Sequence, residues 1–317
     1  MGNLSGPYKA IACILLFQLT ISCNLTEQYI QKSEKTYEKL GTRSQYVETD
    51  SAKVFVRRIG DAKNKLVLIH GFGPLPQVQW EDLTEELHND FEIIIPDLIY
   101  FGNSISNSKD YSVQFQARQM AKVLSEIEVE RFYIAGLSYG GMVSALMAHN
   151  HPNEVEGLIL IDALSKYSDR SYTDSLARAN GAEDAADFLL PENGKGMKRL
   201  FKLTYFKPPK YPAFLLNKPA QVLYKDPKGH KNAMIQHLRN NEDLLKESDV
   251  QYEGPVQIIW GKADRLIPPE NAVHLSEYYP NSRLQFIEKS AHVPNIENSK
   301  EVADIILKFF NTLKNKP

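Results

Sequence analysis

Ser138 has the type and the neighbours of a catalytic nucleophile. It is the middle residue of the run GLSYG (residues 136–140), which follows the apolar stretch 132–135 and precedes a helical pattern. A serine between two glycines at a strand-to-helix turn is a nucleophile elbow, whose strained backbone lifts the hydroxyl clear of the sheet. Glycine neighbours are required because larger side chains would clash in so tight a turn. This context predicts that Ser138 attacks a carbonyl carbon.

A serine hydroxyl becomes a good nucleophile only when a base takes its proton and a third group orients that base. His292 lies just after the last apolar strand pattern, at 284–287, and Asp264 lies in a turn after the preceding one, at 256–261. The order serine, acid, histidine is the one that accompanies this kind of elbow. Each residue alone could be an ordinary loop residue, but the three contexts together favour His292 as general base and Asp264 as its orienting acid.

An early glycine-containing loop offers a site for developing negative charge. Acyl transfer requires two backbone N–H groups that point at the oxyanion. Tyr139, directly after the nucleophile, supplies one candidate, and Phe72 in the run HGFG (residues 70–73) supplies the other. Pro74 has no N–H and is excluded. The sequence contains neither of the usual glycine-rich phosphate-binding motifs, so we interpret the loop as an oxyanion hole.

At this point the chain resembles the α/β-hydrolase superfamily from about residue 46 to its C-terminus, and within it the monoacylglycerol lipase/esterase-like group of capped serine hydrolases. The resembling blocks are HGFG at 70–73, PDLIYFGNS at 96–104, GLSYGG at 136–141, IIWGKAD at 258–264 and SAHVPNIE at 290–297. The resemblance implies a serine ester hydrolase with the triad Ser138, Asp264 and His292. It also leaves Asp162 as an alternative acid, because some superfamily members take the acid from the end of the sixth strand.

Strand and helix patterns alternate along the chain, as in a parallel sheet flanked by helices. We predict the α/β-hydrolase fold, with a mostly parallel eight-stranded sheet and a helical cap inserted between strands six and seven. The core comprises residues 45–162 and 251–317, and the proline-interrupted residues 163–250 form the cap. The predicted strands are residues 45–49, 53–58, 66–69, 92–95, 132–135, 157–161, 256–259 and 284–287, and the predicted core helices are 80–89, 113–127, 142–150, 271–279 and 300–313.

The first 22 residues have the pattern of an export signal. Lys9 precedes an apolar run at 10–22, which is too short to span a bilayer as a helix. A small residue before Cys23 resembles a bacterial lipoprotein cleavage site, after which the cysteine carries the lipid. The other interpretation is a secretory signal or short anchor with an incidental cysteine. We expect an exported protein, lipid-anchored to the cell envelope if bacterial and otherwise secreted, with residues 23–44 as a tether.

Composition and charge limit the kinds of ligand and partner that the sequence predicts. The chain has 317 residues, a net charge of −2 and two cysteines, and it contains no HExxH motif or cysteine pair typical of a metal site. We therefore expect neither a metal nor a cofactor. Residues 195–231 carry ten Lys or Arg and one acid, which suits an anionic lipid surface but also any solvated helical face. No nucleic-acid motif accompanies this basic segment.

These observations favour a serine hydrolase that cleaves carboxylic esters, with a lipid-like substrate, through an acyl-enzyme. The alternatives are a carbon–carbon bond or amide hydrolase of the same fold, and a non-catalytic surface binding protein on the same scaffold. Ser138 argues against the dehalogenases and epoxide hydrolases of this fold, which use an aspartate as nucleophile.

Overall fold

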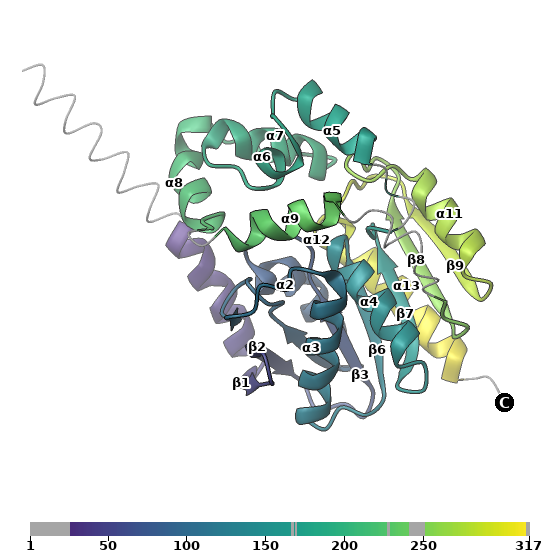
Figure 1. The fold of residues 1–317 in the computed structure, drawn as a ribbon. Coiled ribbons are helices and arrows are strands. Elements are labelled where there is room, and N and C mark those ends of the chain that lie inside the picture. Colours follow the sequence, from purple (N-terminus) through teal and green to yellow (C-terminus); the bar gives the residue numbers. More distant parts are fainter. Residues whose placement is uncertain (1–25, 166–167, 169, 227–228, 241–250, 315–317) are drawn as a thin grey trace, which may run out of the picture.

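A nine-stranded, mostly parallel sheet forms the centre of the protein (Figure 1). The computed structural model describes residues 26–165, 168, 170–226, 229–240 and 251–314. The strand order is β1-β2-β4-β3-β6-β7-β8-β9, and β5 pairs with β2. The strands are β1 (Arg43–Glu48), β2 (Ala52–Ile59), β3 (Lys65–Ile69), β4 (Glu92–Pro96), β5 (Ile105–Ser106), β6 (Phe132–Leu137), β7 (Val155–Ile161), β8 (Val256–Gly261) and β9 (Ser282–Ile287).

All eight predicted strands are present, and the predicted fold class is confirmed. β5 is an additional strand. It was not predicted, because two residues are too few to show the alternating pattern of a strand. β2 is antiparallel to β1, β4 and β5, whereas every pair from β4 across to β9 is parallel. The central strands β4, β6 and β8 are buried along their whole length, which explains their continuous apolar sequences.

Helices cover both faces of the sheet. The side chains of α3, α4 and α11 join one buried cluster, and those of α2, α13 and the helix over residues 26–39 join another on the opposite face. The core helices are α2 (Pro76–Leu87), α3 (Val113–Glu126), α4 (Tyr139–Asn150), α11 (Glu270–Tyr278), α12 (Pro294–Glu297) and α13 (Ser299–Lys314). Each predicted core helix is present, and α2 and α4 begin earlier than predicted.

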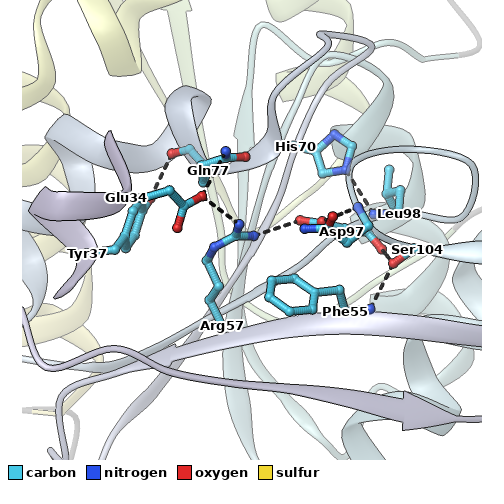
Figure 2. A network of polar contacts seen from close by, with 10 residues as sticks. Glu34, Tyr37, Phe55, Arg57, His70, Gln77, Asp97, Leu98 and Ser104 are labelled. Atoms are coloured by element: carbon cyan, nitrogen blue, oxygen red, sulfur yellow. Dashed lines mark hydrogen bonds and ion pairs between the residues drawn. The ribbon is translucent and has the colours of Figure 1, made fainter. Parts of the chain in front are cut away.

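The helix over residues 26–39 packs against the core, within the segment predicted as a tether. Tyr37 is buried, and its hydroxyl donates to the carbonyl of Gln77 at 2.7 Å. Glu34 accepts hydrogen bonds from Arg57 of β2 and from the Gln77 side chain, each at 3.2 Å. Arg57 also donates to Asp97, just after β4, at 3.1 Å. Figure 2 shows this network, which joins the first helix to the sheet and to α2.

A group of helices between β7 and β8 lies over the end of the sheet (Figure 1). These cap helices are α5 (Arg170–Ala179), α6 (Ala185–Leu189), α7 (Gly194–Thr204), α8 (Ala213–Leu223) and α9 (His230–Asn240). The cap has a small apolar cluster of its own around Phe188 and Leu200. It contacts the core where Tyr172 donates to the carbonyl of Arg265 and where the N–H of Phe206 donates to Glu297. Among the residues described, no helix has the length and apolarity to cross a bilayer.

Candidate active site

Ser138 occupies a strained turn between β6 and α4. Its backbone has φ 54° and ψ −120°, a region that residues other than glycine rarely adopt. Its N–H donates to the carbonyl of Ile161 at 3.0 Å, and its own carbonyl accepts from the N–H groups of Gly141 and Leu164 at 2.9 Å. These three bonds hold the strained conformation, and the side chain remains half-buried rather than sealed in the core. Ser138 therefore has the local geometry expected of a nucleophile elbow.

The loop after β3 runs directly beside this turn. A Cβ placed on Gly71 would lie 3.2 Å from the Cβ of Ser138 and 3.2 Å from the carbonyl oxygen of Leu137. Contacts this short are rare for real Cβ atoms, so a glycine is needed for the two loops to approach so closely. The close approach brings Phe72 beside Tyr139, with their rings edge to face at 5.7 Å.

His292 and Asp264 form a buried, hydrogen-bonded pair on the loops after β9 and β8. The Nδ1 of His292 lies 2.8 Å from Oδ2 of Asp264. The other carboxylate oxygen of Asp264 accepts from the N–H groups of Leu266 and Ile267 at 2.8 and 3.1 Å. These bonds orient the carboxylate toward Nδ1, which then carries the proton and leaves Nε2 free to act as a base.

Asp162, the alternative acid, lies beside this pair. It is fully buried at the end of β7, and its Oδ1 accepts from the N–H of Gly261 at 3.0 Å. Burial raises its pKa well above the ordinary value, and the charge and hydrogen bond of Asp264 raise it further. A protonated Asp162 would donate a hydrogen bond rather than accept one from His292. Of the two aspartates, the structure brings Asp264 into hydrogen-bond contact with the histidine.

The three side chains Asp162, Asp264 and His292 are also of types that can bind a metal ion, and they bring oxygen and nitrogen atoms within 4.8 Å of one another. A metal ion would need deprotonated ligands with free lone pairs. Here the raised pKa of Asp162 favours its protonated form, and the hydrogen bond between Asp264 and His292 already uses one atom of each. The arrangement suits proton transfer better than metal binding.

Phe72 and Tyr139 offer two unused backbone donors. Tyr139 is the first residue of α4, where a helix leaves its N–H groups without internal partners. Within the described residues, the N–H groups of Phe72 and Tyr139 make no hydrogen bond. The half-buried Ser138 side chain lies between the two loops that carry them. Both predicted oxyanion donors are therefore available to a ligand.

His70 is a residue of this site that sequence analysis did not single out. It is fully buried, its Nδ1 lies 2.7 Å from the carbonyl oxygen of Gly71, and its Nε2 accepts from the N–H of Leu98 at 2.9 Å. Burial lowers its pKa to about 4, so the ring is neutral and donates from Nδ1. The Gly71 carbonyl belongs to the same peptide group as the Phe72 N–H, so His70 fixes the orientation of that donor. Its place directly before Gly71 is the only sequence signal for this role.

Gln79 holds the same loop from the other side. Its Oε1 accepts from the N–H of Gly71 at 3.0 Å, while its carbonyl accepts from the Asn295 side chain in α12. The glutamine thus connects the predicted oxyanion loop to the segment that follows His292.

Cys23, the predicted lipidation site, and the signal-like residues 1–22 lie outside the described residues.

Comparison with known proteins agrees with this fold. Residues 64–299 match the family described as alpha/beta hydrolase fold. The chain belongs to this family. This α/β hydrolase is 26% identical over 286 residues to Lipase 1 of Psychrobacter immobilis, covering 90% of the chain and 88% of the relative. It is 21% identical over 260 residues to a human monoacylglycerol lipase, covering 80% of the chain and 77% of the relative.

A solved structure supports the fold of the α/β hydrolase over nearly its whole length. The crystal structure of a membrane phospholipase A, described as a bacterial virulence factor, superimposes with a TM-score of 0.77 at 22% identity. The match covers 98% of this chain and 100% of that chain. The predicted superfamily is therefore confirmed.

Proposed function

We propose that this α/β hydrolase cleaves carboxylic esters, with Ser138 as nucleophile, His292 as general base and Asp264 as the acid that orients the histidine. The hydrogen-bonded Asp264–His292 pair, on loops at the same sheet edge as the strained Ser138 turn, carries this proposal. Parallel strands end at one edge of the sheet, so the loops after β6, β8 and β9, which carry Ser138, Asp264 and His292, all begin at that edge.

In the proposed reaction, Ser138 Oγ attacks the ester carbonyl while Nε2 of His292 takes the hydroxyl proton. The negative charge on the carbonyl oxygen is stabilised by the N–H groups of Phe72 and Tyr139. His292 then protonates the leaving alcohol, and a water molecule hydrolyses the acyl-enzyme with His292 again as base. Asp264 keeps the proton on Nδ1 and stabilises the imidazolium that forms in each step.

The names of the relatives favour a lipid-like ester as substrate. Lipase 1 of Psychrobacter immobilis and a human monoacylglycerol lipase match most of this chain. A third relative, 27% identical over 264 residues, is a pimeloyl-[acyl-carrier protein] methyl ester esterase from Aeromonas hydrophila. The names of all three relatives refer to the cleavage of acyl esters, whereas the triad alone would also suit an amide or carbon–carbon bond hydrolase.

Replacement of the nucleophile tests the proposal. We expect Ser138→Ala to abolish labelling by a fluorophosphonate probe and to lower the kcat for p-nitrophenyl butyrate by about 10⁴-fold or more. Ser144→Ala, which changes a buried serine of α4, is the matched control and should keep both signals. Undiminished labelling of Ser138→Ala would show that Ser138 is not the nucleophile. A labelled enzyme that hydrolyses no ester would favour the amide or carbon–carbon alternative.

We also propose that the protein works at a membrane, held there by a lipid on Cys23 and by the cap. Large hydrophobic side chains are exposed on α8 and on the helix over residues 26–39, which lie side by side in Figure 1. Tyr29, Tyr211 and Phe214, here called the aromatic patch, are each more than half exposed. Lys207 and Lys210 come just before Tyr211 in the sequence. Aromatic and basic side chains together favour binding to an anionic lipid surface.

A further inference from the structure

A cavity of about 550 Å³ lies beside the predicted oxyanion loop. Its walls come from the helix over residues 26–39, the loop that continues from Gly73 into α2, the loop after β4, and the cap helices α8 and α9. Apolar side chains, among them Ile30, Leu75 and Leu223, line part of it, and Asn103, Ser104 and Ser106 line another part. Its size falls within the range of small-molecule sites, and its lining suits a ligand with both apolar and polar parts.

Lys231, in the first turn of α9, lines this cavity without a partner. The residue is only 8% exposed, and its ammonium group makes no hydrogen bond or ion pair within the described residues. It lies over the ring of Phe101, 5.4 Å from the centroid, which compensates in part for lost hydration. A largely buried lysine that faces a cavity with no ion-pair partner among the described residues is a candidate for binding a ligand of opposite charge.

The acids of the cavity are already bound elsewhere. Glu34 accepts from Arg57 and from Gln77, and Asp226 accepts from the N–H of Asn232 at 3.0 Å. Neither carboxylate forms an ion pair with Lys231, although the charge of Asp226 acts to raise the pKa of the lysine against the lowering effect of burial. The unsatisfied group of the cavity is therefore a cation, and the missing partner is an anion.

Phe101 connects this lysine to the reaction centre. Its buried ring contacts Phe72, the predicted oxyanion residue, at 5.0 Å between centroids, and His70 at 5.1 Å. Lys231 lies over the same ring, and its charge contributes to the lowered pKa of His70. An anion bound by Lys231 would thus lie one aromatic ring away from the loop that stabilises the oxyanion.

We propose that the cavity is a substrate subsite in which Lys231 binds an anionic group, a phosphate or carboxylate, carried by the ester. This inference rests on the proposed ester hydrolysis and narrows it to acyl esters with a charged head group, of which a monoacylglycerol phosphate is a chemically simple example. The apolar wall accepts the part of the substrate next to the charge, while the carbonyl reaches Ser138. Lys231 is then a specificity-determining residue that takes no part in bond cleavage.

A matched pair of substrates tests the subsite. Octanoylglycerol and octanoylglycerol phosphate, both below their micellar concentrations, differ only in the phosphate. We expect the wild type to prefer the phosphate ester, and Lys231→Met to lower kcat/KM for it by about 10- to 100-fold, the range of one charged hydrogen bond. Hydrolysis of octanoylglycerol should fall much less than that of the phosphate ester, so that the preference is lost, and Lys231→Arg should retain most of the preference. Lys308→Met, which removes an exposed lysine of α13, controls for net charge.

Binding to Ser138→Ala, measured by calorimetry, separates the subsite from the chemistry. If the wild type hydrolyses no ester, the proposed function fails, but Lys231-dependent binding of octanoylglycerol phosphate would still support the subsite. Equal affinity of Ser138→Ala with and without the Lys231→Met change would overturn it. Lys231-dependent binding of inorganic phosphate without any substrate preference would also overturn it, in favour of a free-anion site. Lys231→Met should melt at or above the wild-type temperature, whereas a structural lysine would lower it.

Discussion

Two buried aspartates, Asp162 and Asp264, lie at the base of the candidate site in different environments. Asp264 accepts two backbone N–H bonds and contacts His292, whereas Asp162 has one backbone partner and no exposure to solvent. Burial, followed by the charge of Asp264, raises the pKa of Asp162. The raised pKa favours the protonated form of Asp162. This division gives the two carboxyl groups different roles.

The two asparagine substitutions should differ sharply. We expect Asp264→Asn to lower kcat by about 10⁴-fold, because an amide cannot hold the required tautomer or stabilise the imidazolium. Asp162→Asn should change kcat only a few-fold, because the amide resembles the protonated acid in shape and can donate toward Asp264. Steady-state kinetics on a soluble ester, with circular dichroism to verify folding, measures both. A larger loss in Asp162→Asn would reverse the assignment of the acid.

The stability of Asp162→Asn should depend on pH in a defined direction. Below the ordinary value of 3.8, Asp162 is protonated in both the folded and unfolded states. Above it the wild type must take up a proton on folding, so its free energy of unfolding falls by up to about 1.4 kcal/mol per pH unit relative to the variant. The variant should thus gain stability over the wild type as pH rises from 4 toward neutrality. Urea unfolding across this range checks the sign.

An ion-pair network centred on the buried Arg57 joins the first described helix to the sheet. Arg57 on β2 bonds Glu34 of the helix and Asp97 after β4 (Figure 2). Asp97 is fully buried, and burial raises its pKa to about 6 although the Arg57 charge acts in the opposite direction. The same turn after β4 contains Leu98, whose N–H donates to His70. The network therefore links the N-terminal helix to the predicted oxyanion loop.

Removal of Arg57 should destabilise the fold in a pH-dependent way. At about pH 8, Arg57→Met leaves the Asp97 carboxylate unpaired, and we expect a loss of about 3–5 kcal/mol. At about pH 5 a proton replaces the guanidinium as partner, so the loss should be smaller. The sign follows because Arg57 lowers the pKa of Asp97. Without Arg57 this pKa rises further, so the stability of the variant continues to fall above pH 6, where that of the wild type levels off. Chemical denaturation at both pH values measures the difference.

A second substitution serves as the control for this element. Asp97→Asn combined with Arg57→Met removes the charge that would be left unpaired, and should recover much of the stability lost at pH 8. If Arg57→Met is equally destabilising at both pH values and the double variant shows no recovery, the ion pair is not what the fold requires at this position.

At the scale of the whole molecule, three features lie in one region. They are the basic residues 195–231, the exposed aromatic patch, and the beginning of the helix over residues 26–39. The aromatic patch includes Tyr29 near the N-terminal end of the first helix, and Tyr211 and Phe214 of the cap. Residues 195–231 have a net charge of +9, which leaves −11 for the rest of the chain. We propose that this distribution orients the cap toward an anionic bilayer, with the beginning of the helix over residues 26–39 at the same end (Figure 1).

Reversal of charge beside the aromatic patch tests this orientation. We expect Lys207→Glu with Lys210→Glu to weaken binding to anionic vesicles by about 1 kcal/mol for each lysine removed, and added salt to have the same effect. Hydrolysis of a soluble short-chain ester should not change. The same reversals at Lys300 and Lys308 of α13 form the matched control. Equal responses of vesicle binding to both pairs would show that the basic cap is only a solvated surface.

The proposed lipid anchor at Cys23 is tested by a separate labelling experiment. In a host that processes lipoproteins, a clickable fatty acid should label the wild type at Cys23 and leave Cys23→Ser unlabelled. Labelling of both proteins would remove the anchor from the proposal but would leave the patch and its vesicle test unaffected.

Local patterns in the sequence were enough to predict the fold and most of the candidate site. Buried parallel strands are continuously apolar, so their sequence pattern indicated the fold. The turns after these strands carry Ser138, Asp264 and His292 in the expected order, which indicated the site. The sequence favoured Asp264 as the acid but left Asp162 as an alternative, because each follows a strand at the same edge. The distinction depends on packing, because Asp264 contacts His292, whereas Asp162 is buried and accepts one backbone N–H bond.

Tertiary structure alone decided the remaining features, because each joins residues far apart in the chain. The short strand β5 exists only through its pairing with β2, and His70 acquires its role only where Leu98 and Gly71 meet it. The Lys231 cavity likewise needs the first helix, the oxyanion loop and the cap together. In sequence Lys231 was one of ten basic residues in the cap segment. Its burial, and the lack of an ion-pair partner in the described part of the chain, depend on packing and distinguish it.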